Sequence, residues 1–148
     1  MRKRCTLSAV IGLMVVPLLI AGCTFWIQTS DGRVRSVNVP DDHVERFVNR
    51  MDQLSADLLQ ETERIGDYRL RQAAVELRWT YTQAVEGIGQ GTPANPVDLE
   101  NIEAKLDAFE RQLDQRLSSG AERQRYRTVL WYFQEIERAY QEFRDAVL

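Results

Sequence analysis

Four amphipathic segments follow one another after residue 40. In each of them, apolar residues recur at steps of three and four, which places them on one face of an α-helix. The third segment shows the pattern most clearly, with Leu99, Ile102, Leu106, Phe109, Leu113 and Leu117. The pattern predicts helices over residues 42–65, 68–88, 96–118 and 120–147.

The residues between these segments carry signals that begin and end helices. Gly66 suits a left-handed C-terminal position, Asp67 suits an N-cap, and Ser119 with Glu122 has the spacing of a capping box. The first and last connections are very short, so the helices they join must run antiparallel. We therefore predict an all-α fold, an antiparallel four-helix bundle with its helices in order around a square. The longer connection 89–95 leaves a diagonal crossing as an alternative.

Residues 23–40 have a different character, because they are rich in β-branched and aromatic side chains. Asp31-Gly32 in the middle indicates a hairpin with a type I′ turn. Val34 and Val37 are an odd number of residues apart, however, so their side chains point to opposite faces of a strand. An isolated hairpin is also only marginally stable. We expect a short extended or hairpin tether, which either packs as a ribbon on the bundle or remains a linker.

The start of the chain is typical of a secretory signal peptide. Three basic residues at positions 2–4 precede an apolar run over 7–21, which is shorter than the roughly 20 residues that a membrane span needs. The run ends in Ile20-Ala21-Gly22-Cys23, which resembles the lipobox of bacterial lipoproteins. The resemblance implies cleavage between Gly22 and Cys23, a diacylglyceryl group on the Cys23 thiol, and acylation of the new amino terminus with a fatty acid such as palmitate.

Such processing divides the chain into three parts. These are a signal peptide over 1–22, a lipidated N-terminus and tether over 23–40, and a helical bundle over 41–148. Cys5 would leave with the signal peptide and Cys23 would carry the lipid. The mature domain is then expected to be held by its core alone, without a disulfide.

The lipid would make the membrane the first partner of the protein. Anchoring by two or three acyl chains is effectively permanent. Phe25, Trp26 and Ile27 follow the lipid directly, so they either lie at the depth of the headgroups, where aromatic anchors lie, or belong to a simple linker. Among bacterial lipoproteins, an aspartate after the cysteine is associated with the inner membrane. Thr24 stands there instead, which favours the outer membrane, facing the periplasm, as the location in the cell envelope.

The residue inventory argues against nucleic-acid binding and against catalysis. The chain has 22 acidic and 19 basic residues, and its net charge of −3 becomes more negative without the basic signal peptide. His43 is the sole histidine, so the chain lacks the Glu-x-x-His pairs of a di-iron bundle and the two histidines of a haem site. We expect no enzyme, no metal, no nucleic-acid partner, and no cofactor beyond the covalent lipid on Cys23.

Large apolar residues also occur on the outer faces of two expected helices. On the second helix these are Tyr68, Val75 and Trp79, and on the fourth Trp131, with Tyr132 on its flank. The tether could cover one face, a partner protein or a second copy could bind there, or the residues could be isolated surface hydrophobics. In the square arrangement, we expect the tether to cover the second helix and Trp131 to remain as the contact for a partner.

These patterns favour a membrane-anchored envelope lipoprotein that acts as a non-enzymatic protein-binding or assembly module. Its partner would be an envelope protein or a second copy of the chain. The alternative is a carrier or sensor of a small apolar ligand held between the helices. The apolar faces along which the helices would pack carry large side chains, which argues against space for such a ligand.

Overall fold

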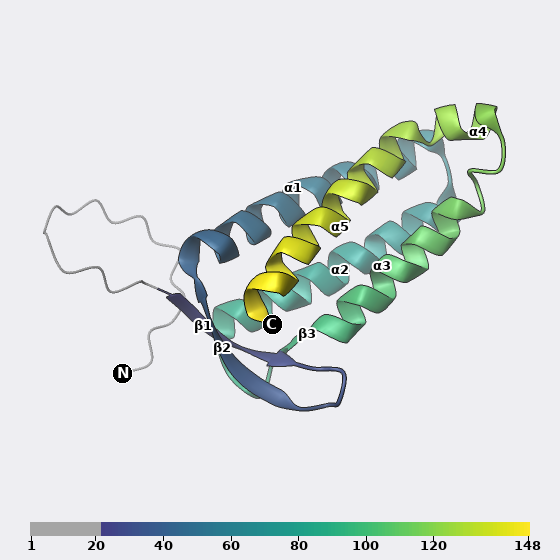
Figure 1. Ribbon diagram of the computed structural model, residues 1–148. Helices are drawn as coiled ribbons and strands as arrows, with labels where there is room; N and C mark the ends of the chain where they lie inside the picture. The colour runs from purple at the N-terminus through teal and green to yellow at the C-terminus, as the bar shows by residue number, and fades with distance from the viewer. Residues whose placement is uncertain (1–21) are drawn as a thin grey trace, which may run out of the picture.

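The computed structural model describes residues 22–148. Residues 1–21 lie outside the described part, and with them Cys5, Ile20, Ala21 and nearly all of the expected signal peptide. Five helices and three strands follow one another (Figure 1): β1 (Gly22–Gln28), β2 (Val34–Pro40), α1 (Asp41–Ile65), α2 (Tyr68–Gln90), β3 (Val97–Asp98), α3 (Leu99–Asp114), α4 (Gly120–Arg125) and α5 (Arg127–Val147). The prediction of an all-α four-helix bundle is therefore wrong, because a three-stranded mixed sheet belongs to the fold and there are five helices.

Local capping explains where most of the helices begin and end. The Asp67 carboxylate accepts the backbone N–H of Leu70 at 3.1 Å and starts α2. Gly66 ends α1 in the left-handed conformation, with φ 78°. The Ser119 hydroxyl accepts the N–H of Glu122 at 3.2 Å and starts α4. These caps lie where the sequence placed them.

The third and fourth expected helices differ from the prediction. The third begins at Leu99 rather than at Pro96, because Asp98 caps it and residues 97–98 pair with β1. The fourth is split at Tyr126, whose backbone conformation, with φ −97° and ψ 9°, separates α4 from α5. Its side chain points into a polar cluster described below.

The long helices follow one another around a square, in the arrangement that the short connections favoured. Helix α1 packs beside both α2 and α5, and α3 packs beside α2, whereas α3 and α5 touch less extensively. The short α4 lies at the end of the body farthest from the sheet (Figure 1). We call this end the tip and the sheet end the base.

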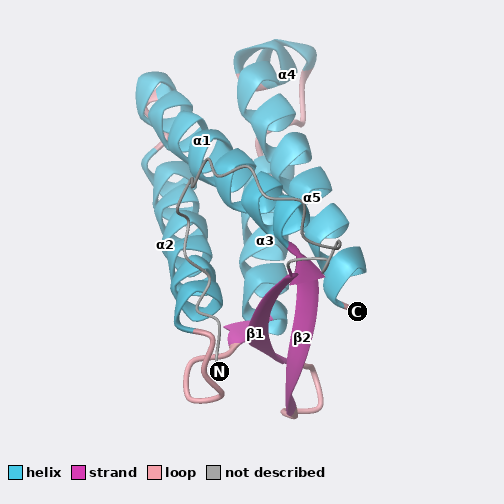
Figure 2. Cartoon of the chain, turned by 90° about the vertical axis from the view of Figure 1, so that its left-hand side faces the viewer, coloured by secondary structure: helices cyan, strands magenta, loops and turns pink. Residues whose placement is uncertain are grey.

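The sheet closes the base with the strand order β2-β1-β3. β1 and β2 form an antiparallel hairpin in which Phe25 lies opposite Val37, and β3 runs parallel to β1 (Figure 2). A hairpin was one of the two forms expected for this segment, but its turn is not of type I′, since Gly32 alone has a positive φ in the turn. The N–H of Gly32 bonds to the carbonyl of Thr29, which gives a type I turn followed by a left-handed glycine.

One face of the hairpin belongs to the core. Phe25, Ile27 and Val39 are 0% exposed. The Phe25 ring stacks on Phe143 of α5 at 6.0 Å between centroids, and Phe143 stacks on Phe47 of α1 at 4.0 Å. Residues 23–40 are thus neither a linker nor a ribbon on the side of the bundle. The expected headgroup position of Phe25 and Ile27 is also wrong, because the end of the bundle offers them complete burial.

Candidate functional site

Cys23, the expected lipidation site, lies at the base in the second position of β1. It is opposite Val39 in the hairpin, and its side chain is 4% exposed on the same face as Phe25. Its sulfur forms a disulfide bond in this structure. A disulfide and a thioether-linked lipid use the same sulfur and exclude each other. Cys5, the other cysteine of the sequence, lies outside the described residues and within the segment that cleavage before Cys23 would remove.

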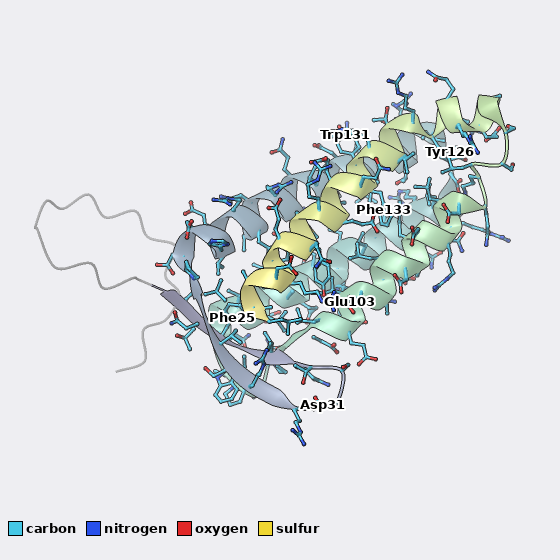
Figure 3. All side chains as sticks on the ribbon, in the orientation of Figure 1. Phe25, Asp31, Glu103, Tyr126, Trp131 and Phe133 are labelled. Carbon is cyan, nitrogen blue, oxygen red and sulfur yellow. The ribbon has the colours of Figure 1, made fainter. Side chains whose placement is uncertain are left out.

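A polar cluster closes the opposite end, the tip. Arg116, after the end of α3, donates from Nε to the Asp67 carboxylate and from Nη2 to Asp67 Oδ1 at 3.0 Å. The Tyr126 hydroxyl donates to Asp67 Oδ2 at 2.8 Å. The side chains of Asp67 and Arg116 are only 11% and 16% exposed. We call these three residues the tip cluster; it joins the α1–α2 turn to the end of α3 and the start of α5 (Figure 3 labels Tyr126).

The tip cluster keeps Asp67 ionised. Burial alone would raise the pKa of Asp67, but hydrogen bonds from Arg116, the Leu70 N–H and Tyr126 lower it to about 2. Burial and the neighbouring Asp67 raise the pKa of Tyr126, so its hydroxyl remains a donor. All strong donors around Asp67 are engaged with it. The cluster therefore fastens helices together, and it offers no reactive group to a substrate.

Guanidinium groups without a carboxylate partner gather around this cluster. Within residues 22–148, the arginines at the tip that form no ion pair are Arg69, Arg71, Arg111, Arg123, Arg125 and Arg127, whereas the base has Arg35. Arg123 and Arg127 border an open depression together with Asp114, Leu117, Gly120, Gln124 and Leu130. The tip therefore carries several guanidinium groups outside any ion pair, beside carboxylates such as Asp114 and Glu122 that form no ion pair either.

An exposed aromatic pair lies next to these arginines on α5. Trp131, which Figure 3 labels, is 54% exposed, and its ring meets Tyr132 edge-on at 5.1 Å between centroids. Tyr132 is half-buried against the core. Trp131 is four residues after Arg127, so both side chains lie on one side of the helix, one turn apart. We call Arg123, Arg127, Trp131 and Tyr132 the tip surface.

The outer face of α2 carries the second predicted group of apolar residues. Tyr68, Val75 and Trp79 are 73%, 41% and 62% exposed. The expectation that the 23–40 segment covers this face is wrong, since the hairpin packs across the base instead. α2 and α5 occupy diagonal corners of the square, so the two aromatic faces cannot form one patch.

The remaining candidate groups are engaged or exposed. His43 is exposed, and no group of His, Cys, Asp or Glu within residues 22–148 is arranged to hold a metal ion. Glu61, at a seam position, is held by Arg64, whose hydrogen bond lowers the pKa of Glu61. Burial, together with Glu110 and Asp107, raises the pKa of Glu137. These carboxylates belong to ordinary helix surfaces and carry no constellation typical of acid–base catalysis.

The centre of the bundle is filled rather than hollow in its described part. Phe109 of α3 stacks on Phe133 of α5 at 5.0 Å, although these two helices touch less extensively than the other neighbouring long helices. No helix of residues 22–148 has the length and apolar character that crossing a bilayer requires.

Comparison with protein-family models, with curated proteins and with solved structures found no match.

Proposed function

We propose that the chain is a lipoprotein of the bacterial envelope that binds an acidic partner protein through its tip surface, without catalysis. Cys23 carries the anchor, and Thr24 after it favours the outer membrane, facing the periplasm. The anchor is supported by Ile20-Ala21-Gly22-Cys23 behind a basic and then apolar start. Lipidation requires the Cys23 sulfur to leave both its disulfide and its buried position.

The observation that carries the binding role is the charge of the tip. Arginines without carboxylate partners are gathered there, while the protein as a whole is acidic. Complementary charge steers association and selects partners. An acidic segment of a partner protein can therefore pair with tip guanidinium groups that no carboxylate of the chain occupies.

Trp131 supplies the apolar part of the same surface. Tryptophan and arginine are the residues most enriched among those that dominate binding energy at protein interfaces. The edge-on contact with Tyr132 holds the Trp131 ring against a helix that is itself packed on the core. A side chain that is already positioned loses little conformational entropy on binding. Trp79 has no aromatic partner of this kind among the described residues.

The anchor is tested by fatty-acid labelling. Wild-type protein expressed in a bacterial host of native type is expected to incorporate labelled palmitate and to be cleaved before Cys23. Cys23→Ala is expected to remain unlabelled and unprocessed, while Thr24→Ala, one residue away, is expected to be labelled normally. Absence of label on the wild-type chain contradicts the lipoprotein proposal.

The partner surface is tested by photo-cross-linking in intact cells. A benzophenone amino acid replaces Trp131 in one variant and Trp79 in the matched control, because both sites are exposed on long helices. We expect a protein cross-linked through position 131, identified by mass spectrometry, whose contact segment is rich in Asp and Glu. Cross-linking through position 79 alone, or to a contact segment without acidic residues, contradicts the proposal.

A further inference from the structure

We propose, on the basis of the lipidation of Cys23 proposed above, that the outer face of the β1–β2 hairpin lies directly on the bilayer that holds the anchor. Trp26 is then at the depth of the lipid headgroups, and the long helices extend away from the membrane. The occupant of this face is a phospholipid surface. The protein therefore presents its tip surface at a defined height above the membrane.

The shortness of the chain between lipid and core leads to this orientation. Cys23 is followed by Thr24 and then by Phe25, which is 0% exposed and stacked on Phe143. Even if Cys23 leaves its place opposite Val39, two extended residues span only about 7 Å. The headgroup layer of one leaflet is itself about 5–7 Å thick. The base of the domain therefore cannot stand clear of the membrane.

The alternation of side chains along the hairpin determines which face meets the lipid. Phe25 and its neighbours of the same parity point into the core, so the opposite parity forms the outer face. That face consists of Thr24, Trp26 and Gln28 from β1, and of Val34, Ser36 and Asn38 from β2. None of these side chains is charged, although 28% of the residues in the chain are. Placing this face among headgroups therefore desolvates no carboxylate.

Two apolar side chains of this face suit the membrane interface. Trp26 is half-buried rather than fully covered, and Val34 is 39% exposed. Tryptophan is enriched at the headgroup level because its ring is apolar and its N–H can still bond to a polar group. Exposed Arg33, in the turn beside the face, can approach lipid phosphates. The Asp31 carboxylate in the turn is held by Thr29 and Arg33.

The shape of the molecule then gives the height of the tip. The sheet lies across one end of the helices and α4 lies at the other (Figures 1 and 2). Helix α1 has 25 residues, and at 1.5 Å per residue it is about 37 Å long. Within the tip surface, Trp131 lies 16 residues before Val147 at the base end of α5, which places it about 24 Å from that end. Trp131 is far from the lipid, and Trp26 is in contact with it.

The three tryptophans of the chain make this orientation measurable. One variant, Trp79→Phe/Trp131→Phe, keeps Trp26 alone, and the matched control, Trp26→Phe/Trp79→Phe, keeps Trp131 alone. The lipidated proteins are reconstituted in vesicles of phosphatidylcholine and phosphatidylglycerol that carry bromine either near the headgroup or deep in the acyl chains. We expect Trp26 to lose most of its emission to the shallow bromines and to become inaccessible to aqueous iodide. Trp131 is expected to keep its emission and its access to iodide.

Each other outcome overturns the orientation. If the bromines quench Trp131 but not Trp26, the tip lies on the membrane. If they quench neither tryptophan, the domain stands away from the membrane. Protection of Trp26 from iodide without lipid quenching, together with a doubled particle mass, means that a second copy covers the hairpin. The mass of the Cys23 peptide is measured on the same preparation. If the Cys23 peptide carries no lipid, the proposed anchor and the proposed orientation are both wrong. If the peptide is lipidated and Trp26 is not quenched, only the proposed orientation is wrong.

Discussion

The two ends of the helical body are closed by different chemistry. At the base, Phe25, Ile27 and Val39 fill the space between the helix ends with apolar side chains, and no charge takes part. At the tip, Asp67, Arg116 and Tyr126 join three connections through ionised and hydroxyl groups. The stability of the base therefore depends on buried apolar area, whereas that of the tip depends on the ionisation of a single carboxylate.

The outer surfaces of the two ends differ in the same sense. The hairpin presents uncharged side chains around Trp26, and the tip presents arginines that form no ion pair. Unpaired charge at the surface carries little benefit for stability, but it directs association with a charged partner. This difference is why we propose the membrane for the base and the protein partner for the tip.

Phe25→Ala is expected to have the largest effect on the free energy of unfolding. Removing a fully buried phenylalanine costs about 3–5 kcal/mol, because apolar contacts are lost and a cavity remains. Urea unfolding followed by circular dichroism measures the change. Ser36→Ala, on the exposed face of the same hairpin, is the control and is expected to stay within about 0.5 kcal/mol. A loss for Phe25→Ala no larger than that of the control would show that the hairpin is not part of the core.

Asp67→Asn is expected to have the next largest effect, and an effect that depends on pH. The pKa of Asp67 is about 2 in the folded protein, against about 3.9 for an unfolded chain. The folded pKa is the lower one, so the ionised carboxylate stabilises the fold above pH 4, by about 2–3 kcal/mol. This contribution disappears as the pH falls from about 4 through 2.

Urea titrations of the wild type and of Asp67→Asn between pH 3 and pH 7 measure this contribution. The difference between the two unfolding free energies is expected to shrink as the pH falls. Asp42→Asn is the matched control, because the Asp42 side chain is 67% exposed and its pairing with Arg46 contributes little. A difference that stays constant over this range would mean that ionisation of Asp67 is not what closes the tip.

Arg123→Gln/Arg127→Gln is expected to affect binding rather than stability. Loss of two positive charges from the tip surface should weaken the complex with the partner cross-linked through position 131 by about tenfold at low salt, with a smaller loss at high salt. Surface plasmon resonance at two salt concentrations measures this. Arg33→Gln/Arg46→Gln removes the same charge at the base and should leave affinity unchanged. Equal losses in both variants would indicate attraction by net charge alone.

Trp131→Ala is expected to have the smallest effect on stability. Since the side chain is 54% exposed, the free energy of unfolding should change by no more than about 0.5 kcal/mol. Trp79→Ala should change the stability in thermal unfolding as little as Trp131→Ala does. Binding of the cross-linked partner separates the two variants, because only Trp131→Ala should reduce it. Unfolding of the domain by Trp131→Ala would instead place this residue in the core.

Helix positions were readable from the sequence because their signals are local. The steps of three and four residues and the caps at Asp67 and Ser119 act within one or two turns of chain. Exposure of Trp79 and Trp131 followed from the same periodicity. The Asp31-Gly32 pair likewise indicated a hairpin, although three residues rather than two form its loop.

The role of residues 23–40 was not readable in this way. Val34 and Val37 have opposite parity because one faces outward and the other lies against the core. The sequence pattern alone does not say which parity is buried. Only the open end of the bundle, where Phe25 meets Phe143, makes the odd positions the inner face. The strand at Val97 was missed for the same reason, since two residues become a strand only beside β1.

What the sequence by itself determined is therefore the set of long helices, their antiparallel order, the hairpin and the outward position of the exposed aromatics. Each depends on neighbours within a few residues. The tertiary structure decided what closes the two ends. Arg116 reaches Asp67 across 49 residues of chain, and Phe25 reaches Phe143 from a different element. Such contacts form only when the whole chain is packed, because no local interaction selects one distant partner over another.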